Sequence, residues 1–95
     1  MFDRSNLQVF ANHTRAAAEN MAYTLQRTAH SAFVKETEDF TVMLINRKGE
    51  TFGVPMSLGA TWYPGLTYTR AIEMVGDYKP GDVAFTNAHL YLMQR

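Results

Sequence analysis

A long helical repeat of apolar and small residues near the N-terminus is the feature that most limits how this chain can fold. That spacing predicts one amphipathic helix from Ser5 to about Thr28. In a chain of 95 residues the remaining segments must then arrange themselves around this helix. The residues of the stripe, spaced three and four apart, are Leu7, Phe10, Ala11, Thr14, Ala17, Ala18, Met21, Ala22, Leu25 and Ala29.

The start of this helix carries polar residues that can bond its first backbone N–H groups. Ser5 followed three residues later by Gln8 predicts a capping box, and Asp3 suits the positive end of the helix dipole. Small residues at Ala16–Ala18 and Ala22 allow a neighbouring backbone to come close. We therefore interpret the apolar stripe as a packing face.

A β-hairpin is predicted in the middle of the chain. Phe40–Ile45 is rich in strand-forming residues, and Glu50–Val54 returns after Asn46–Gly49. Gly49 can take a positive φ, which suits a four-residue loop built on a type I turn followed by a left-handed residue. Pro55 is expected to end the second strand because it has no N–H to donate.

The segments on either side of this hairpin are predicted to be irregular. Residues 29–39 show no sustained period and should form a turn or an irregular connection. Residues 57–65 are rich in glycine and aromatic side chains and should form a loop. Loops of this kind tend to be functional or to lie against a partner.

Shorter elements are predicted in the last third of the chain. Leu66–Val75 can form a second helix with Tyr68, Ile72 and Val75 on one face, stopped by Gly76. Lys79–Asp82 is a Pro-Gly turn, and Val83–Thr86 should follow as a further strand. The expected fold class is α+β, with residues 1–95 forming a single partial domain of a larger fold.

Composition excludes several classes of protein. Nine basic and nine acidic residues cancel and are interspersed, so no net field attracts nucleic acid or an acidic membrane. The absence of cysteine excludes a disulfide framework, thiolate-bound zinc and a cysteine nucleophile. A polar N-terminus and the lack of an apolar run of roughly 20 residues argue against a signal peptide and a membrane span. We therefore expect a cytoplasmic location.

Apolar side chains are abundant for so small a chain. It contains six Phe, five Tyr, one Trp and six Met, more than a thin core can hide. Exposed apolar patches usually mark a contact surface. Residues 87–95 also carry no stop signal and contain several apolar side chains. We therefore expect an oligomer or a piece of a larger protein.

Reactive side chains are sparse. The histidines His13, His30 and His89 are too far apart in sequence for a metal motif. Ser31, His30 and Asp39 make a catalytic triad on paper, yet no Gly-x-Ser-x-Gly elbow holds a serine. No glycine-rich loop precedes a lysine and a helix start, so ATP is not expected to bind here. The chain should therefore lack a complete active site.

One charged cluster, Lys35–Asp39, has two interpretations. The structural one is a solvated loop with ion pairs that each contribute a fraction of a kcal/mol. The functional one is that Lys35, Glu36 and Asp39 line the polar edge of a site that groups outside this chain complete.

Several short runs occur in an order that is shared with a known family. Leu25–Ser31 is followed by Lys35-Glu36 and Asp39-Phe40, and Asn46–Gly49 then forms a glycine turn. This order resembles the hydantoinase B family, which includes 5-oxoprolinase C-terminal halves and acetone carboxylase alpha subunits. Pro55 with Leu58-Gly59 is similar to the family's Pro-x-His-Leu-Gly, and Pro80–Val83 with Asn87 is similar to its Pro-Gly-Asp leading to Asn-Asp-Pro-Tyr.

The chain also departs from the family pattern. Ser57 stands where the family usually has histidine, and Ala88 stands where an aspartate follows Asn87. The stretch implied in divalent-metal binding begins where this chain becomes Ala88–Tyr91, and His89 is not a safe substitute for its ligands. The resemblance implies the leading segment of such a subunit, whether truncated, diverged or incomplete in sequence.

The resemblance further implies an activity shared with other polypeptide. Family enzymes open a cyclic amide such as a hydantoin or 5-oxoproline, or carboxylate a ketone, usually at the expense of ATP. A hydantoinase A-type partner would bind the ATP, and the remainder of the B-type subunit would hold a divalent metal. The alternative is a non-catalytic interaction module that docks on a larger partner.

Overall fold

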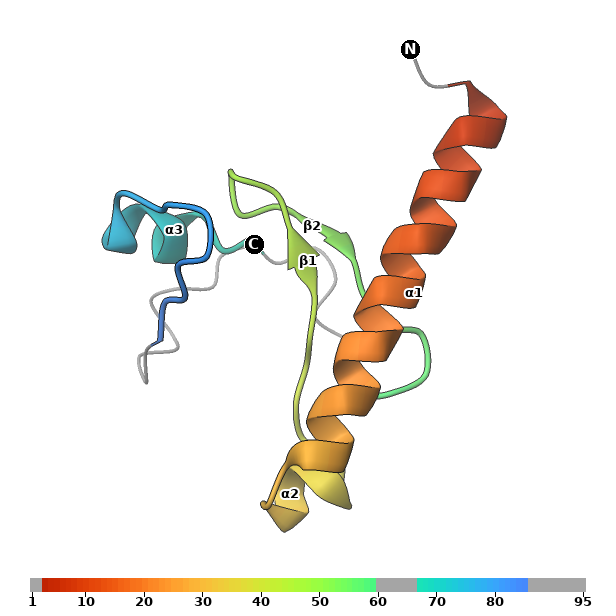
Figure 1. Cartoon of the computed structure of the whole chain (residues 1–95), viewed down its shortest axis with the longest axis vertical. Helices are drawn as coiled ribbons and strands as arrows, with labels where there is room; N and C mark the ends of the chain where they lie inside the picture. The colour runs from red at the N-terminus through yellow and green to blue at the C-terminus, as the bar shows by residue number, and fades with distance from the viewer. Residues whose placement is uncertain (1–2, 60–66, 86–95) are drawn as a thin grey trace.

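A computed structural model describes residues 3–59 and 67–85 of the chain. The hairpin lies between α1 on one side and α3 on the other, and α2 follows the C-terminal end of α1 (Figure 1). No helix in these described ranges is both long and apolar enough to cross a membrane. The elements in chain order are α1 (Arg4–Thr28), α2 (Ala32–Lys35), β1 (Leu44–Ile45), β2 (Thr51–Gly53) and α3 (Thr69–Val75).

The long N-terminal helix is confirmed, but its start differs from the prediction. Asp3 is the N-cap, and its carboxylate Oδ1 accepts a hydrogen bond from the Asn6 backbone N–H at 2.8 Å. The predicted capping box of Ser5 and Gln8 is therefore wrong, since Ser5 lies inside the helix. Asp3 stands at the position whose side chain can reach the free N–H groups, and its negative charge also suits the helix dipole.

The packing face of α1 is confirmed only around its alanines. Ala18 and Ala22 have no exposed surface, and they lie on the same helix face as Glu19. Leu7 and Phe10, nearer the N-terminus, are about half exposed. The Phe10 ring stacks on Phe52 of β2, with 6.3 Å between ring centroids. The core is therefore small and centred on the C-terminal half of α1.

The connection after α1 is more regular than predicted. Residues Ala32–Lys35 form the single helical turn α2, and the Ser31 hydroxyl oxygen accepts a hydrogen bond from the Phe33 N–H at 3.2 Å. One helical turn is too short to show a period in the sequence, which explains why α2 was not predicted within the expected turn or irregular connection. After α2, Glu38 adopts a left-handed φ of 55°.

The hairpin and its turn are confirmed, although the strands are shorter than predicted. Leu44 pairs antiparallel with Gly53 and Ile45 with Thr51, with a register shift between the two pairs. In the turn, the Gly49 N–H donates to the Asn46 carbonyl at 3.0 Å, and Gly49 has the predicted positive φ, at 85°. The Asn46 side chain holds this turn by accepting from two further backbone N–H groups.

The second predicted helix is confirmed as α3, with Tyr68 as its N-cap. Gly76 follows the helix with a φ of 83°, as predicted for a stop signal. The Pro-Gly turn is also confirmed, because the Asp82 N–H donates to the Lys79 carbonyl at 3.0 Å. The predicted start of the helix at Leu66 lies outside the described residues.

The further strand predicted over 83–86 is wrong for the residues that can be checked. Residues 83–85 form no strand, and Thr86 lies outside the described ranges. Val83 and Phe85 are 91% and 95% exposed. Strand propensity is realised only when a neighbouring strand and an apolar face are present. The predicted loop over 57–65 is described only for residues 57–59.

The turn at Gly49 supports a testable prediction about stability. A Cβ at this position would lie 2.7 Å from the Thr69 Cα, and the positive φ disfavours any L side chain. We expect Gly49→Ala to lower the free energy of unfolding by about 3 kcal/mol, measured by urea denaturation. Gly76→Ala is the matched control, since it shares the positive φ but has nothing within 4 Å. The control should cost about 1 kcal/mol, and equal losses in both variants would contradict the steric argument.

Candidate functional site

The charged cluster that the sequence singled out lies at the corner between α1 and α2. The Lys35 ammonium donates to the Arg27 carbonyl at 3.5 Å, and the Gln26 side-chain amide donates to the Lys35 carbonyl at 3.3 Å. Lys35 therefore joins α2 to the C-terminal end of α1. A cation near the last carbonyls of a helix is also favoured by the helix dipole.

Glu36 and Asp39 are brought to the same corner, and both are exposed. Their backbone N–H groups close the turn after α2, donating to the Ala32 carbonyl at 2.9 Å and to the Phe33 carbonyl at 2.8 Å. The described structure thus gathers Lys35, Glu36 and Asp39 on one solvent-facing corner. Their role as the polar edge of a site stays a prediction.

Glu38, between these residues, has a clear structural partner that the sequence did not reveal. Its carboxylate Oε1 accepts a hydrogen bond from the Gly59 N–H at 3.1 Å. Gly59 itself has a φ of 80°, and a Cβ there would lie 2.9 Å from the Phe40 carbonyl oxygen. Glu38 therefore fixes one end of the segment Pro55–Gly59, which we call the 55–59 loop.

Glu19 on α1 fixes the other end of the 55–59 loop. Its Oε1 accepts from the Met56 N–H at 2.5 Å and from the Ser57 N–H at 3.3 Å, and the Ser57 hydroxyl lies 3.5 Å from Oε2. Hydrogen bonds from backbone N–H groups to a carboxylate are stronger than neutral ones. One carboxylate thus orients two consecutive peptide groups and the serine side chain.

Apolar packing also supports the 55–59 loop. Pro55 is fully buried and Leu58 is buried, as are Ala18 and Ala22 on the α1 face beside Glu19. Met56 and Ser57 are exposed. The loop is therefore anchored at Pro55 and Leu58 and presents Met56 and Ser57, which lie between them, to solvent. A single carboxylate on an alanine-rich packing face was the sequence signal that could have identified Glu19.

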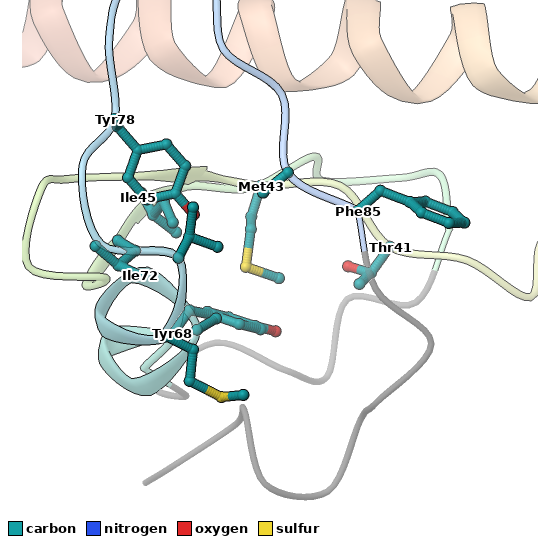
Figure 2. Close-up of a pocket in the computed structure, with 11 residues that line it drawn as sticks. Thr41, Met43, Ile45, Tyr68, Ile72, Tyr78 and Phe85 are labelled. Carbon is teal, nitrogen blue, oxygen red and sulfur yellow. The ribbon is translucent and has the colours of Figure 1, made fainter.

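A second feature is an apolar groove between β1 and α3, with a volume of about 580 Å³. Thr41 and Met43 point from the hairpin to the side away from α1, toward Ile72 and Tyr68 (Figure 2). The predicted α3 face of Tyr68, Ile72 and Val75 does line this groove. We call it the β1–α3 groove; its lining residues are Thr41, Met43, Ile45, Tyr68, Ala71, Ile72, Met74, Val75, Tyr78, Ala84 and Phe85.

The other candidates for chemistry are not assembled into a site. Within residues 3–59 and 67–85, no three histidine or acidic side chains come together to hold a metal ion. The described residues thus offer no cluster of ligands for a divalent metal. The Ser31 hydroxyl caps α2, which is a structural use of the serine in the triad considered above. His89 lies outside the described residues.

Comparison with known proteins gives consistent results. The sequence model for hydantoinase B/oxoprolinase matches residues 3–92. A protein named 5-oxoprolinase PfmaA from Pestalotiopsis fici is 35% identical over an alignment of 85 residues that covers 85% of this chain. An uncharacterized protein of Schizosaccharomyces pombe is 36% identical over an alignment of 89 residues that covers 90% of the chain. The chain spans only 6% and 7% of the lengths of these relatives. No solved structure gives a significant match.

Loss of the Glu19 carboxylate should loosen the 55–59 loop. We expect Glu19→Ala to raise the hydrogen-exchange rates of the Met56 and Ser57 amides about 10-fold or more, because both would lose a charged acceptor. Amide exchange followed by NMR measures this directly. Ser57→Ala is the control, since it removes only the longer hydroxyl contact and should leave the Met56 rate within about 3-fold. Unchanged exchange in Glu19→Ala would show that packing alone holds the loop.

Proposed function

Because this chain belongs to the hydantoinase B/oxoprolinase family, we propose that it is a segment of the B-type subunit of an ATP-dependent cyclic-amide hydrolase. The observation that carries the proposal is the family match over residues 3–92, together with the identity to a protein named 5-oxoprolinase. That name favours ring opening of a lactam or hydantoin over ketone carboxylation, which the related acetone carboxylases perform. The proposed enzyme works in the cytoplasm.

The proposed reaction divides its chemistry between polypeptides. A cyclic amide resists hydrolysis because its nitrogen donates electrons to the carbonyl. A hydantoinase A-type partner would use ATP to phosphorylate the amide oxygen, which makes the carbonyl carbon more electrophilic. Water then attacks that carbon, and the ring C–N bond breaks as its nitrogen takes a proton from this water. A second water hydrolyses the resulting acyl phosphate to a carboxylate and inorganic phosphate. Stabilising the charge that develops on oxygen is the largest task in such a step.

This segment would supply positioning groups to that reaction. The 55–59 loop is held on both flanks by carboxylates and exposes Met56 and Ser57, so it can present them in a fixed geometry. Lys35, Glu36 and Asp39 gather at an exposed corner, which suits the edge of a site completed by other polypeptide. Groups held on a rigid frame lose less entropy when a substrate binds. ATP and the divalent metal would be held elsewhere in the assembly.

A docking module without catalytic residues is the second candidate. The observation that favours it is the β1–α3 groove, which is apolar and includes strongly exposed side chains such as Met74 and Phe85. A module of this kind would bind a larger protein and contribute nothing to turnover. The two candidates differ in the effect of changing Asp39 within a complete enzyme.

The proposal predicts that the isolated 95-residue chain is inactive. With ATP, Mg²⁺ and either 5-oxoproline or hydantoin, we expect no ring-opened product above the uncatalysed background. Product formation is measured by chromatography and ATP consumption by phosphate release. A full-length family enzyme, assayed in parallel with its A-type activity, provides the positive control. Turnover by the isolated chain would contradict the proposed division of labour.

A substitution at the position of Asp39 tests the proposed role of the charged corner. In a full-length relative, we expect Asp39→Ala at the aligned position to lower kcat/KM about 10-fold, the effect of losing one positioning interaction. The thermal midpoint should change by less than about 2 °C, because this residue is exposed in the present chain. Normal kinetics in that variant would favour the docking module instead.

A further inference from the structure

The β1–α3 groove carries no charge along its walls. Its eleven lining side chains are aliphatic, aromatic, thioether or hydroxyl groups, contributed by residues 41–45 of the hairpin, by the helix α3 region and by Ala84 and Phe85. Figure 2 shows Met43, Ile72 and Tyr68 facing the same space from the two sides. A charged occupant would lose its hydration here without gaining an ionic partner from these walls. The groove therefore suits an uncharged, apolar surface.

The described part of the chain leaves this groove open. Met74 is 67% exposed, and Val75 and Tyr78 are also exposed although they line the groove. By contrast, the buried apolar residues Ala18, Ala22 and Leu58 all lie on the α1 side of the hairpin. A continuous apolar surface of this kind is characteristic of a contact with further protein.

The border of the groove carries charges of both signs. A neighbouring depression shares Ile72 with the groove, and its charged lining residues are Arg47, Lys48, Glu50 and Glu73. An apolar centre beside mixed polar groups is the usual arrangement of a protein–protein contact. Nucleic acid would instead require a surface dominated by positive charge. The chemistry of the groove and its border therefore favours a polypeptide as the occupant.

The length of the relatives favours the rest of the same subunit as this polypeptide. The matching region is 6% and 7% of their chains, so nearly all of each relative lies outside the segment that corresponds to this protein. A groove open in the segment can therefore be filled within the same subunit. A helix or strand that presents apolar side chains would fit between β1 and α3.

We infer that the β1–α3 groove is the surface on which the remainder of the B-type subunit packs, through an uncharged apolar segment. This inference rests on the proposed function, since it takes the rest of the family subunit as the occupant. It adds to that function by separating two faces of the segment. On the α1 side of the hairpin, Glu19 and Glu38 fix the 55–59 loop, and the opposite face of the hairpin receives the rest of the subunit.

The test compares one substitution in two settings. Met74→Lys is made in the isolated chain and in the full-length P. fici relative whose matching segment is replaced by the aligned residues of this chain. In the isolated chain the exposed lysine should change the thermal midpoint by less than about 2 °C. In the full-length protein the lysine would be buried, and the midpoint should fall by about 5 °C or more.

Glu73→Lys is the matched control, because it introduces the same side chain at the neighbouring α3 position without lining the groove. It should lower the full-length midpoint by less than half as much as Met74→Lys. Equal effects of the two lysines, or a harmless Met74→Lys in the full-length protein, would overturn the inference. The inference would likewise fail if the full-length relative that carries the segment of this chain had the same thermal midpoint with and without Met74→Lys.

A second measurement tests whether another copy of this chain occupies the groove. Sedimentation of the isolated chain should show a monomer, and Met74→Lys should not alter its mass. A dimer that the substitution dissociates would overturn the inference in favour of self-association. Both readouts report folding and association, not turnover. Failure of the proposed enzymatic role would instead appear as normal packing with no contribution of this segment to activity.

Discussion

The hydrogen bonds that Glu19 accepts from the 55–59 loop are the contacts on which the described fold most depends. They join residues 37 and 38 positions apart in a chain whose buried apolar residues, among those described, are Ala18, Ala22, Pro55 and Leu58. Burial stabilises by roughly 25 cal/mol per Å² of apolar area, and two alanines bring little of it. Long-range hydrogen bonds to a carboxylate therefore add tertiary stability beyond this small apolar core.

Sequence patterns predicted the elements whose causes are local. The long helix follows from its apolar spacing, and the turns at Gly49 and Gly81 follow from the positive φ that glycine allows. The errors have equally specific causes. The helix start was predicted at Ser5 instead of Asp3 because aspartate and serine are equally good N-caps and the two residues are only two positions apart. The strand at 83–86 failed over its described residues because no neighbouring edge pairs with it there.

The candidate site was harder to predict because its contacts are long-range. Lys35 and Asp39 attracted notice as charges close together in sequence, yet Glu19 and Glu38 are the acids whose partners the structure identifies. Those partners lie 37 and 21 residues away, and no short pattern records such a pairing. The groove had a partial signal, since the α3 face of Ile72 and Val75 was predicted, but its hairpin wall was not paired with that face in advance.

The two sides of the hairpin differ in how far their polar groups are hydrogen-bonded and their apolar side chains are covered. This difference explains why so small an α+β segment can keep a defined shape. Toward α1, small side chains let backbones approach, and carboxylates bind the exposed N–H groups of the loop. Toward α3, bulky apolar groups such as Met43 and Met74 face a space that described residues do not fill. Satisfied polar contacts fix local geometry, whereas unfilled apolar surface drives association. A segment built this way can hold its loop in place before its other face is covered.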